Sequence, residues 1–153
     1  ELYGLGYDVH AFMPNPGIGV PYNELKSAIN MRGVQDVGIF GYSWGGQRTY
    51  ELADEIDATR GNFRPFRTRF TAYIDAFNAA TRLAVDRRPP ASDYHVNIFQ
   101  TKGRIHGTAM PSGGANEQYD LTGDTVNHYN IDDLPVQVHA VIRRALEANM
   151  PRK

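Results

Sequence analysis

The sequence contains no cysteine, no long apolar run and no excess of charge of either sign. Without cysteine the chain has no disulfide, no cysteine-ligated zinc site and no thiol nucleophile. No apolar stretch approaches the roughly 18–20 residues that a membrane-spanning helix requires. The 16 Lys and Arg residues nearly balance the 17 Asp and Glu residues, so there is no electrostatic basis for binding nucleic acid or an anionic membrane.

What the sequence does contain suits one folded domain. Its 153 residues lie near the commonest domain size, and 41% of them are hydrophobic, which is too many for a disordered chain. No linker divides the chain, so we predict a single domain over residues 1–153. The chain begins at Glu1 rather than at a methionine, and we expect the domain to be incomplete at its N-terminus.

Short apolar segments alternate with segments of helical periodicity along the chain. Strands are predicted over residues 7–12, 37–42, 70–74 and 94–99, and helices over residues 22–31, 44–58 and 134–148. Residues 101–133 show no sustained period, which in a compact domain indicates a functional loop or disorder. Strands that alternate with helices predict an α/β fold with a mostly parallel sheet flanked by helices.

The most informative motif is Gly41-Tyr42-Ser43-Trp44-Gly45-Gly46, which contains the pattern Gly-x-Ser-x-Gly. It lies between a predicted strand and a predicted helix, the context in which this motif exposes a serine on a sharp, strained turn. Both motif glycines are expected to be required, because a side chain at either position would collide with the neighbouring strand or helix. Ser43 is therefore the candidate nucleophile, and the Trp44 backbone N–H is the candidate donor to an oxyanion. The alternative is an ordinary glycine-rich turn in which Ser43 caps the helix.

A serine nucleophile needs a base, usually a histidine that is itself oriented by a carboxylate. The sequence has five histidines. His10 and His95 lie in predicted strands and His139 lies on the polar side of the last helix, so structural roles are predicted for these three. His106 and His128 lie in the irregular segment before that helix, where doubly wound hydrolases present their histidine. His128 is closer to the helix and is the preferred base, with His106 as the alternative.

The acid that orients the base is expected between the serine and the histidine, in the order Ser, Asp or Glu, His. Asp75 ends the third predicted strand, at the edge of the sheet where parallel strands present functional groups, and is the preferred acid. Asp120 and Asp124 lie in the same irregular segment as His128 and are alternatives. Asp93 precedes a strand, which places it at the opposite edge of the sheet.

These segments resemble proteins of the α/β-hydrolase fold, of the lipase, esterase and thioesterase kind, and more narrowly a group of bacterial hydrolase-like proteins. The resemblance is carried by residues 6–10, 41–46, 71–76, 94–97 with Gln100, and 128–133. It implies a serine hydrolase with Ser43 as nucleophile, His128 as base and Asp75 as acid, acting on a small-molecule acyl ester or thioester without a cofactor. The alternative is a catalytically silent module that retains the fold for binding or scaffolding.

The sequence departs from that fold in two ways. Only one strand is predicted before the strand at residues 37–42. The strand and loop that supply a second oxyanion donor in that fold are therefore expected upstream of Glu1, with the loop at residues 14–20 as a candidate substitute. The final strand expected before the histidine is not evident between residues 101 and 127. The sequence has neither a dinucleotide- or phosphate-binding glycine loop nor a zinc-binding spacing of histidines and carboxylates, so no cofactor or metal is predicted.

Overall fold

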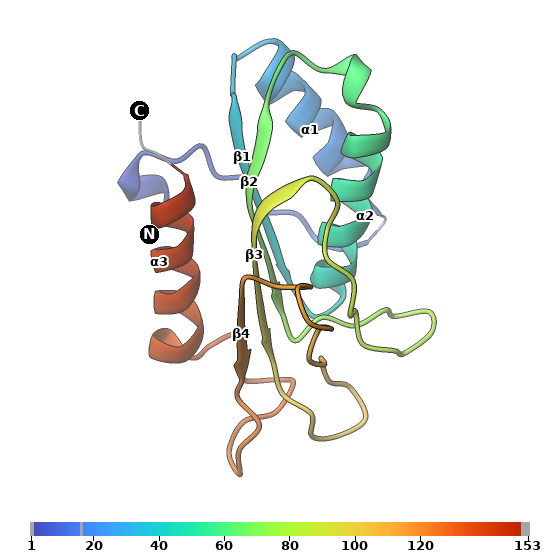
Figure 1. Cartoon of the computed structure of the whole chain (residues 1–153), viewed down its shortest axis with the longest axis vertical. Helices are drawn as coiled ribbons and strands as arrows, with labels where there is room; N and C mark the ends of the chain where they lie inside the picture. Colours follow the sequence, from blue (N-terminus) through green and yellow to red (C-terminus); the bar gives the residue numbers. More distant parts are fainter. Residues whose placement is uncertain (1, 16, 151–153) are drawn as a thin grey trace.

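The computed structural model of the chain describes residues 2–15 and 17–150. Its elements, in chain order, are the 3₁₀ turn η1 (Tyr3–Leu5), helix α1 (Gly19–Asn30), strand β1 (Asp36–Tyr42), helix α2 (Trp44–Ala58), the 3₁₀ turn η2 (Arg60–Asn62), strands β2 (Arg67–Ile74), β3 (Ser92–Phe99) and β4 (Glu117–Asp120), the π-helical turn η3 (Pro135–His139) and helix α3 (Ala140–Asn149). Four parallel strands form one sheet and the three α-helices pack against it (Figure 1). The predicted α/β fold with a parallel sheet is confirmed.

The register of the sheet brings the ends of successive strands together. The strand order is β1-β2-β3-β4, and each neighbouring pair is parallel. Tyr42, the last residue of β1, pairs with Ile74, the last residue of β2, and Ile74 pairs in turn with Ile98 near the end of β3. The residues that directly follow β1 and β2 therefore lie side by side at the carboxyl edge of the sheet.

Helices cover both faces of the sheet, with α1 and α2 on one side and α3 on the other (Figure 1). Successive residues of a strand point to opposite faces, and a strand covered on both faces is apolar almost throughout. The face toward α3 buries Phe70, Ala72, Ile74, Val96, Ile98, Ile131, Val138, Ile142, Ala145 and Leu146. The other face buries Ile29, Val37, Leu52, Ile56 and Phe66 between the sheet, α1 and α2.

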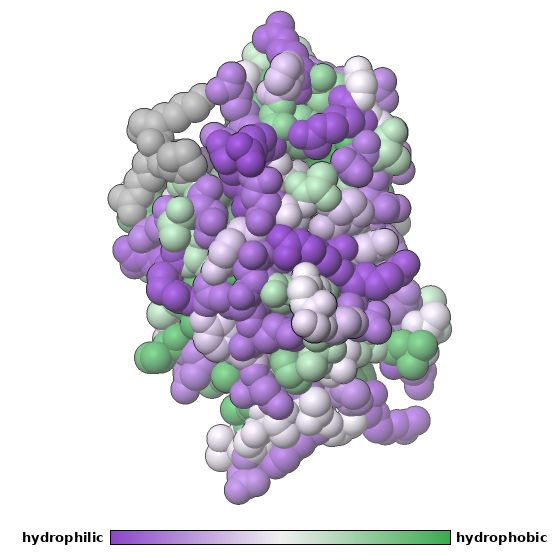
Figure 2. Space-filling view, in the orientation of Figure 1, coloured by the Kyte–Doolittle hydropathy of each residue, from purple (hydrophilic) through white to green (hydrophobic). Residues whose placement is uncertain are grey.

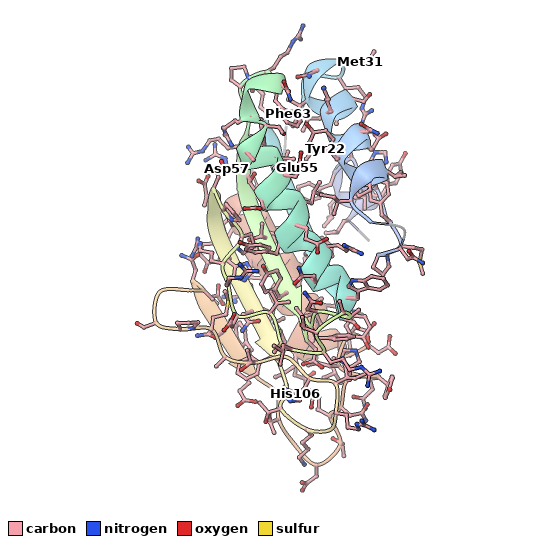
Figure 3. The ribbon with its side chains drawn as sticks, turned by 90° about the vertical axis from the view of Figure 1, so that its right-hand side faces the viewer. Tyr22, Met31, Glu55, Asp57, Phe63 and His106 are labelled. Atoms are coloured by element: carbon pink, nitrogen blue, oxygen red, sulfur yellow. The ribbon has the colours of Figure 1, made fainter. Side chains whose placement is uncertain are left out.

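Loops cover the part of the sheet that α2 does not reach. The side chains of Tyr73, Ala76, Val85 and Met110 form a third buried cluster there. The loop that follows β3 is held to that strand by Asn97, whose Nδ2 donates to the carbonyl of Thr108 at 2.9 Å. Figure 3 shows this loop, with His106, at the opposite end of the molecule from Tyr22 and Phe63. The loops after β2 and β3 are thus gathered at one end of the sheet.

The prediction of a strand over residues 7–12 is wrong. These residues form no regular element. Val9 and Phe12, the apolar side chains of the alternating pattern, are each 43% exposed. The Asp8 carboxylate instead lies 2.9 Å from His10 Nε2 and 3.3 Å from an Arg32 nitrogen. The alternation of apolar and polar residues therefore belongs to a segment on the surface, where it has no sheet face to bury.

The irregular segment 101–133 contains one strand that periodicity did not reveal. Strand β4 is only four residues long and lies at an edge of the sheet, with alternating half-buried and exposed residues. Its Glu117 carboxylate accepts hydrogen bonds from the hydroxyls of Tyr94 and Tyr119 and from Arg144 of α3. Polar contacts rather than an apolar run hold this strand in place.

The final helix, predicted from residue 134, begins as the π-helical turn η3 and becomes α-helical at Ala140.

On the face shown in Figure 2, hydrophilic residues predominate and hydrophobic residues occur in small separate groups. No helix within the described ranges is long and apolar enough to cross a membrane.

Candidate active site

Ser43 lies on a strained turn between β1 and α2. It directly follows Tyr42, the last residue of β1, and directly precedes Trp44, the first residue of α2. Its φ of 59° and ψ of −127° are a conformation that non-glycine residues rarely adopt. The Ser43 N–H donates to the Ile74 carbonyl at 2.9 Å, and the Ser43 carbonyl accepts from the Phe77 N–H at 3.3 Å. Hydrogen bonds to the end of β2 and the residues after it thus hold the strained turn.

Only one of the two motif glycines is required by close packing. A Cβ at Gly41 would overlap the carbonyl oxygen of Gly45, so a side chain is excluded there. A Cβ at Gly45 would meet no atom within 4 Å, which contradicts the expectation that this glycine avoids a collision. The excluded position is instead Gly46, whose Cβ would overlap Cβ of Ala76. The reason is that Gly46, and not Gly45, faces the residue that follows Asp75.

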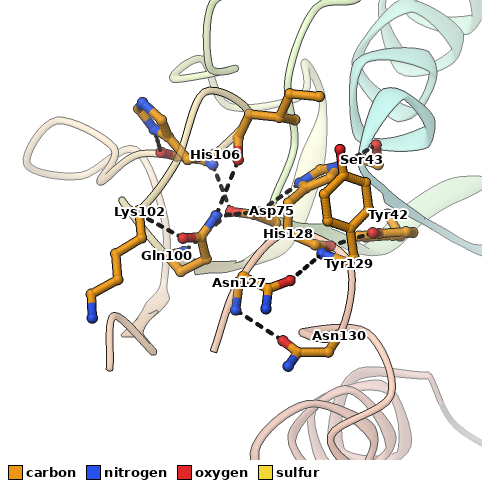
Figure 4. Close-up of polar contacts among 12 residues, drawn as sticks. Tyr42, Ser43, Asp75, Gln100, Lys102, His106, Asn127, His128, Tyr129 and Asn130 are labelled. Atoms are coloured by element: carbon orange, nitrogen blue, oxygen red, sulfur yellow. Dashed lines mark hydrogen bonds and ion pairs between the residues drawn. The ribbon is translucent and has the colours of Figure 1, made fainter. Parts of the chain in front are cut away.

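The structure brings Ser43, His128 and Asp75 together (Figure 4). Ser43 Oγ lies 2.8 Å from His128 Nε2, and His128 Nδ1 lies 2.7 Å from Asp75 Oδ2. The His128 side chain is 6% exposed and the Asp75 side chain is fully buried. The hydroxyl, imidazole and carboxylate therefore form one continuous chain of hydrogen bonds, most of it shielded from water.

The Asp75 carboxylate receives hydrogen bonds at both oxygens. Asp75 directly follows β2 and has a φ of 46°. Its Oδ1 accepts the backbone N–H groups of Gln100 at 3.1 Å and Gly107 at 2.5 Å, and its Oδ2 accepts from Gln100 Nε2 at 2.8 Å as well as from His128. Burial raises the pKa of Asp75, but the hydrogen bonds from His128, Gln100 and Gly107 together outweigh burial and leave that pKa below its usual range.

The ionised carboxylate determines the tautomer of the histidine. A carboxylate can only accept hydrogen bonds, so Nδ1 of His128 carries the proton that it shares with Asp75. Nε2 then presents a lone pair to the Ser43 hydroxyl, which donates to it. This is the arrangement in which an imidazole can remove a proton from a serine.

Aromatic side chains surround the His128 ring. Tyr42 stacks on it, with ring centroids 5.2 Å apart and planes inclined by 28°. Phe77 and Tyr129 meet it edge-on, at 5.4 Å and 5.7 Å. The Tyr42 hydroxyl donates to the His128 backbone carbonyl. Burial, with a smaller contribution from nearby acidic groups such as Asp132, raises the pKa of Tyr42 to about 12, which keeps the hydroxyl protonated as a donor.

His106, the alternative base, does not face the serine. Its Nδ1 donates to the carbonyl of Gly107 at 2.7 Å, and in Figure 4 it lies on the far side of Gln100 and Asp75 from Ser43. The other three histidines also lie elsewhere. His10 pairs with Asp8 on the surface, His139 Nε2 donates to a backbone carbonyl at 2.6 Å, and His95 is fully buried in β3.

Asp120 and Asp124, the two alternative acids, make other contacts in the structure. Asp120 Oδ1 accepts a backbone N–H two residues further along the chain at 2.8 Å. The Asp124 side chain is fully exposed and lies 3.1 Å from Lys102 Nζ. The structure therefore places Asp75, rather than Asp120 or Asp124, against Nδ1 of His128.

The start of α2 supplies a backbone donor beside the serine. Trp44 is the first residue of α2, and the N–H groups of a first helical turn have no partner within the helix. The guanidinium of Arg48 lies 4.8 Å from the centroid of the Trp44 ring, and its Nε donates to the Pro14 carbonyl at 2.9 Å. The loop near Pro14 thus lies beside the first turns of α2, on the same end of the helix as Ser43.

The residues that hold Asp75 were not identified from the sequence. Gln100 follows the last residue of β3, at the same edge of the sheet as Asp75, and this position was the available signal. Gly107 gave no sequence signal, although a Cβ there would lie 2.9 Å from Asp75 Oδ1 and 2.8 Å from Phe99 Cβ. Its contact with Asp75 depends on the path of a loop that has no periodic pattern.

The two best-formed surface hollows lie away from Ser43, His128 and Asp75. Two surface hollows of about 560 and 180 Å³ are lined by α3 and by residues between Ile29 and Pro65, away from Ser43. Within residues 2–15 and 17–150, no group of three or more His, Asp and Glu side chains is arranged to hold a metal ion.

Neither family models, curated proteins nor solved structures match this chain. The structure itself shows a small α/β domain with a four-stranded parallel sheet, whose carboxyl edge carries a mostly buried chain of hydrogen bonds from a serine through a histidine to an aspartate.

Proposed function

We propose that this protein is a serine hydrolase of the α/β-hydrolase kind that cleaves a small-molecule carboxylic ester or thioester. The observation that carries the proposal is the hydrogen-bonded chain of Ser43, His128 and Asp75, with distances of 2.8 and 2.7 Å. These distances lie within the range in which a nucleophile, its base and the orienting acid act together. The three residues also follow the order Ser, Asp, His along the chain that characterises this class.

The proposed reaction starts with attack of the serine on the acyl carbonyl. Ser43 Oγ forms a bond to the carbonyl carbon while its proton passes to Nε2 of His128. The carbonyl oxygen becomes an oxyanion, which the Trp44 N–H and the positive end of the α2 dipole stabilise. Asp75 stabilises the imidazolium without taking up its proton.

The histidine then returns the proton so that the bond to the leaving group breaks. The alcohol or thiol departs with the proton from Nε2, and Ser43 is left as an acyl ester. A water molecule attacks that ester with His128 again acting as base, and the carboxylic acid leaves as Ser43 recovers its proton. Atoms and charge balance without a cofactor, because water is the only other reactant.

Two features of the backbone and side chain at Ser43 and Asp75 support this assignment over a merely structural serine. Ser43 and Asp75 both have positive φ, together with only two other non-glycine residues in the described part of the chain, and such strain concentrates at functional sites. A serine that capped α2 would bond its side chain to an N–H of the first helical turn, but α2 has no side-chain capping bond. The Ser43 hydroxyl is directed to His128 instead.

The proposal is tested by labelling the purified protein with a fluorophosphonate probe and by assaying hydrolysis of p-nitrophenyl esters. We expect the probe to modify Ser43, and Ser43→Ala to abolish both labelling and turnover. His128→Ala should abolish turnover as well, whereas His106→Ala should retain most of it. Absence of labelling and turnover in the wild-type protein would refute the hydrolase and favour a catalytically silent module. Loss of turnover in the His106 variant alone would show that the base is wrongly assigned.

A further inference from the structure

Gln100 is a buried amide next to the proposed triad, and both its Nε2 and its Oε1 are hydrogen-bonded. It is fully buried, directly after β3. Its Nε2 donates to Asp75 Oδ2 at 2.8 Å and to the Ile105 carbonyl at 3.3 Å, while its Oε1 accepts the Lys102 N–H at 2.7 Å. The side chain thus connects the carboxylate of Asp75 to both ends of a short loop.

The partners of Gln100 leave only one orientation for its amide group. The Lys102 N–H can only donate, so it requires Oε1, whereas the Asp75 carboxylate and the Ile105 carbonyl can only accept and require Nε2. A rotation of the amide by 180° would place like groups against each other at all three contacts. The three hydrogen-bond partners of Gln100 therefore require a side chain that has both a donor and an acceptor at this position.

The loop that Gln100 closes brings a second donor to the same carboxylate. Lys102 and Ile105 lie on either side of the loop's tip, and Gly107 follows and donates its N–H to Asp75 Oδ1 at 2.5 Å. No side chain fits at Gly107, because its Cβ would lie 3.2 Å from Cα and 2.9 Å from Oδ1 of Asp75. Gln100 acts on Asp75 in two ways, directly through Nε2 and indirectly by holding the path of the chain to Gly107.

We propose that Gln100 is a positioning residue of this hydrolase, whose side-chain amide fixes the orientation of the Asp75 carboxylate and thereby keeps the Nδ1 proton of His128 in place and Nε2 free to accept from Ser43. The inference rests on the proposed function. Gln100 bonds Asp75, Lys102 and Ile105, and makes no hydrogen bond to Ser43 in the structure. Its effect should therefore fall on the rate of the chemical step and not on substrate binding.

Two substitutions separate the donor function of Gln100 from its packing. Gln100→Met keeps the length of the side chain and removes the donor. We expect kcat to fall by about 10- to 100-fold with KM nearly unchanged, because small misplacements of catalytic groups cost that much in rate. The rate of fluorophosphonate labelling at Ser43 should fall with kcat. Wild-type kcat and labelling rate in a folded Gln100→Met protein would overturn the proposal.

Gln100→Glu keeps the proposal testable where the methionine variant does not fold. A protonated carboxyl at this position retains an O–H donor to Asp75, whereas the ionised form loses it and repels the carboxylate. The activity of this variant relative to wild type should therefore fall as the pH rises. Toward the serine, His128 bonds Asp75, and Tyr42 and Tyr129 contact the His128 ring; on the loop, His106 bonds the Gly107 carbonyl and the Lys102 ammonium pairs with Asp124. All these groups are common to both proteins. A constant ratio across pH would contradict the inference.

Asn97→Leu provides a matched control. Asn97 is a buried amide within β3, three residues before Gln100, and its Nδ2 also bonds the loop after β3, through the Thr108 carbonyl at 2.9 Å. It makes no hydrogen bond to Asp75 in the structure. The variant should lose stability, but its kcat should stay well above that of Gln100→Met, because Gln100 still bonds Asp75 and still closes residues 102–105. If kcat falls as much in Asn97→Leu as in Gln100→Met, the loss of loop packing alone explains the lower kcat of both variants, and the positioning role is refuted.

The downfield NMR resonance of the His128 Nδ1 proton separates this inference from the proposed function. It should be present in the wild type and in Asn97→Leu, and weakened or shifted upfield in Gln100→Met. If the wild type fails to label at Ser43 but the resonance changes as stated, the hydrolase proposal is refuted while the positioning role stands. If the wild type labels and the resonance is the same in all three proteins, the positioning role is refuted alone.

Discussion

The substitution Asp75→Asn should invert the hydrogen bonds of the proposed triad without changing its shape. Oδ1 of Asp75 accepts two backbone N–H groups, those of Gln100 and Gly107, and backbone donors cannot be reversed. An asparagine must therefore place its oxygen at that position and its NH₂ group at the position of Oδ2. That NH₂ group would face Nδ1 of His128 and Nε2 of Gln100.

The size of the expected loss of kcat follows from the change in the tautomer of His128. Facing an NH₂ group, Nδ1 of His128 must accept, so the ring proton moves to Nε2, which then donates to the Ser43 oxygen instead of accepting its proton. The base is lost, and in serine hydrolases a wrong tautomer lowers kcat by about 10⁴-fold, or about 5 kcal/mol of transition-state stabilisation. The two opposed donors at Gln100 add a loss of folding stability of about 1–3 kcal/mol.

The assay is steady-state hydrolysis of a p-nitrophenyl ester, together with urea unfolding to measure stability. Asp124→Asn serves as the control, because Asp124 is exposed and pairs only with a surface lysine in the structure. We expect wild-type activity in the control and almost none in a folded Asp75→Asn protein. An Asp75→Asn variant that keeps kcat within tenfold of wild type would refute the reasoning, since it would show that the carboxylate does not set the tautomer of His128.

Two further predictions concern stability. Gly46→Ala should lower the free energy of unfolding in urea by about 1–3 kcal/mol, because the added Cβ would overlap Ala76. Gly45→Ala should leave that free energy unchanged or raise it by up to about 1 kcal/mol, because alanine has the higher helix propensity. Equal losses in both variants would contradict the packing argument. His95 bonds Thr71 through Nδ1 at 2.8 Å while its Nε2 is buried without a partner, and burial, aided by Arg88, lowers its pKa to about 3. The unfolded chain, with a histidine pKa near 6.5, binds that proton first, so stability should be fully present above pH 6.5 and decline as the pH falls toward 3, by up to about 1.4 kcal/mol per pH unit. Urea unfolding between pH 7 and 5 measures this slope, and the same slope in His95→Gln would exclude His95 as its source.

Periodicity predicted the elements that are buried on at least one broad face. The predicted strand over residues 37–42 and helix over residues 44–58 agree with β1 and α2 to within a residue at each end, and β2 and β3 begin only two or three residues earlier than predicted. Buried strands must be apolar nearly throughout, which makes them visible in the sequence. Strand β4 is short and held by the polar contacts of Glu117, so it has no such signature.

Solvent exposure of the apolar side chains also explains why the strand predicted over residues 7–12 does not form. The alternation there is the same as in a half-buried strand, but nothing in a sequence reports whether a sheet face is available to bury the apolar side chains. In the structure Val9 and Phe12 are partly exposed and Asp8 pairs with Arg32. Local patterning predicts what a segment is suited for, and packing against the rest of the chain decides whether that structure forms.

The sequence by itself indicated Ser43 as the candidate nucleophile, because a strained turn between strand and helix depends on residues adjacent in the chain, such as Gly41 and Ser43. It favoured His128 as the base and Asp75 as the acid but left His106, Asp120 and Asp124 as alternatives. His128 is 85 residues from Ser43 and 53 from Asp75, so their meeting depends on strand order, register and the path of irregular loops. Only the tertiary structure placed Asp75 against His128, and only it showed that Gln100 and Gly107 hold the carboxylate, because hydrogen bonds between distant segments leave no periodic trace in the sequence.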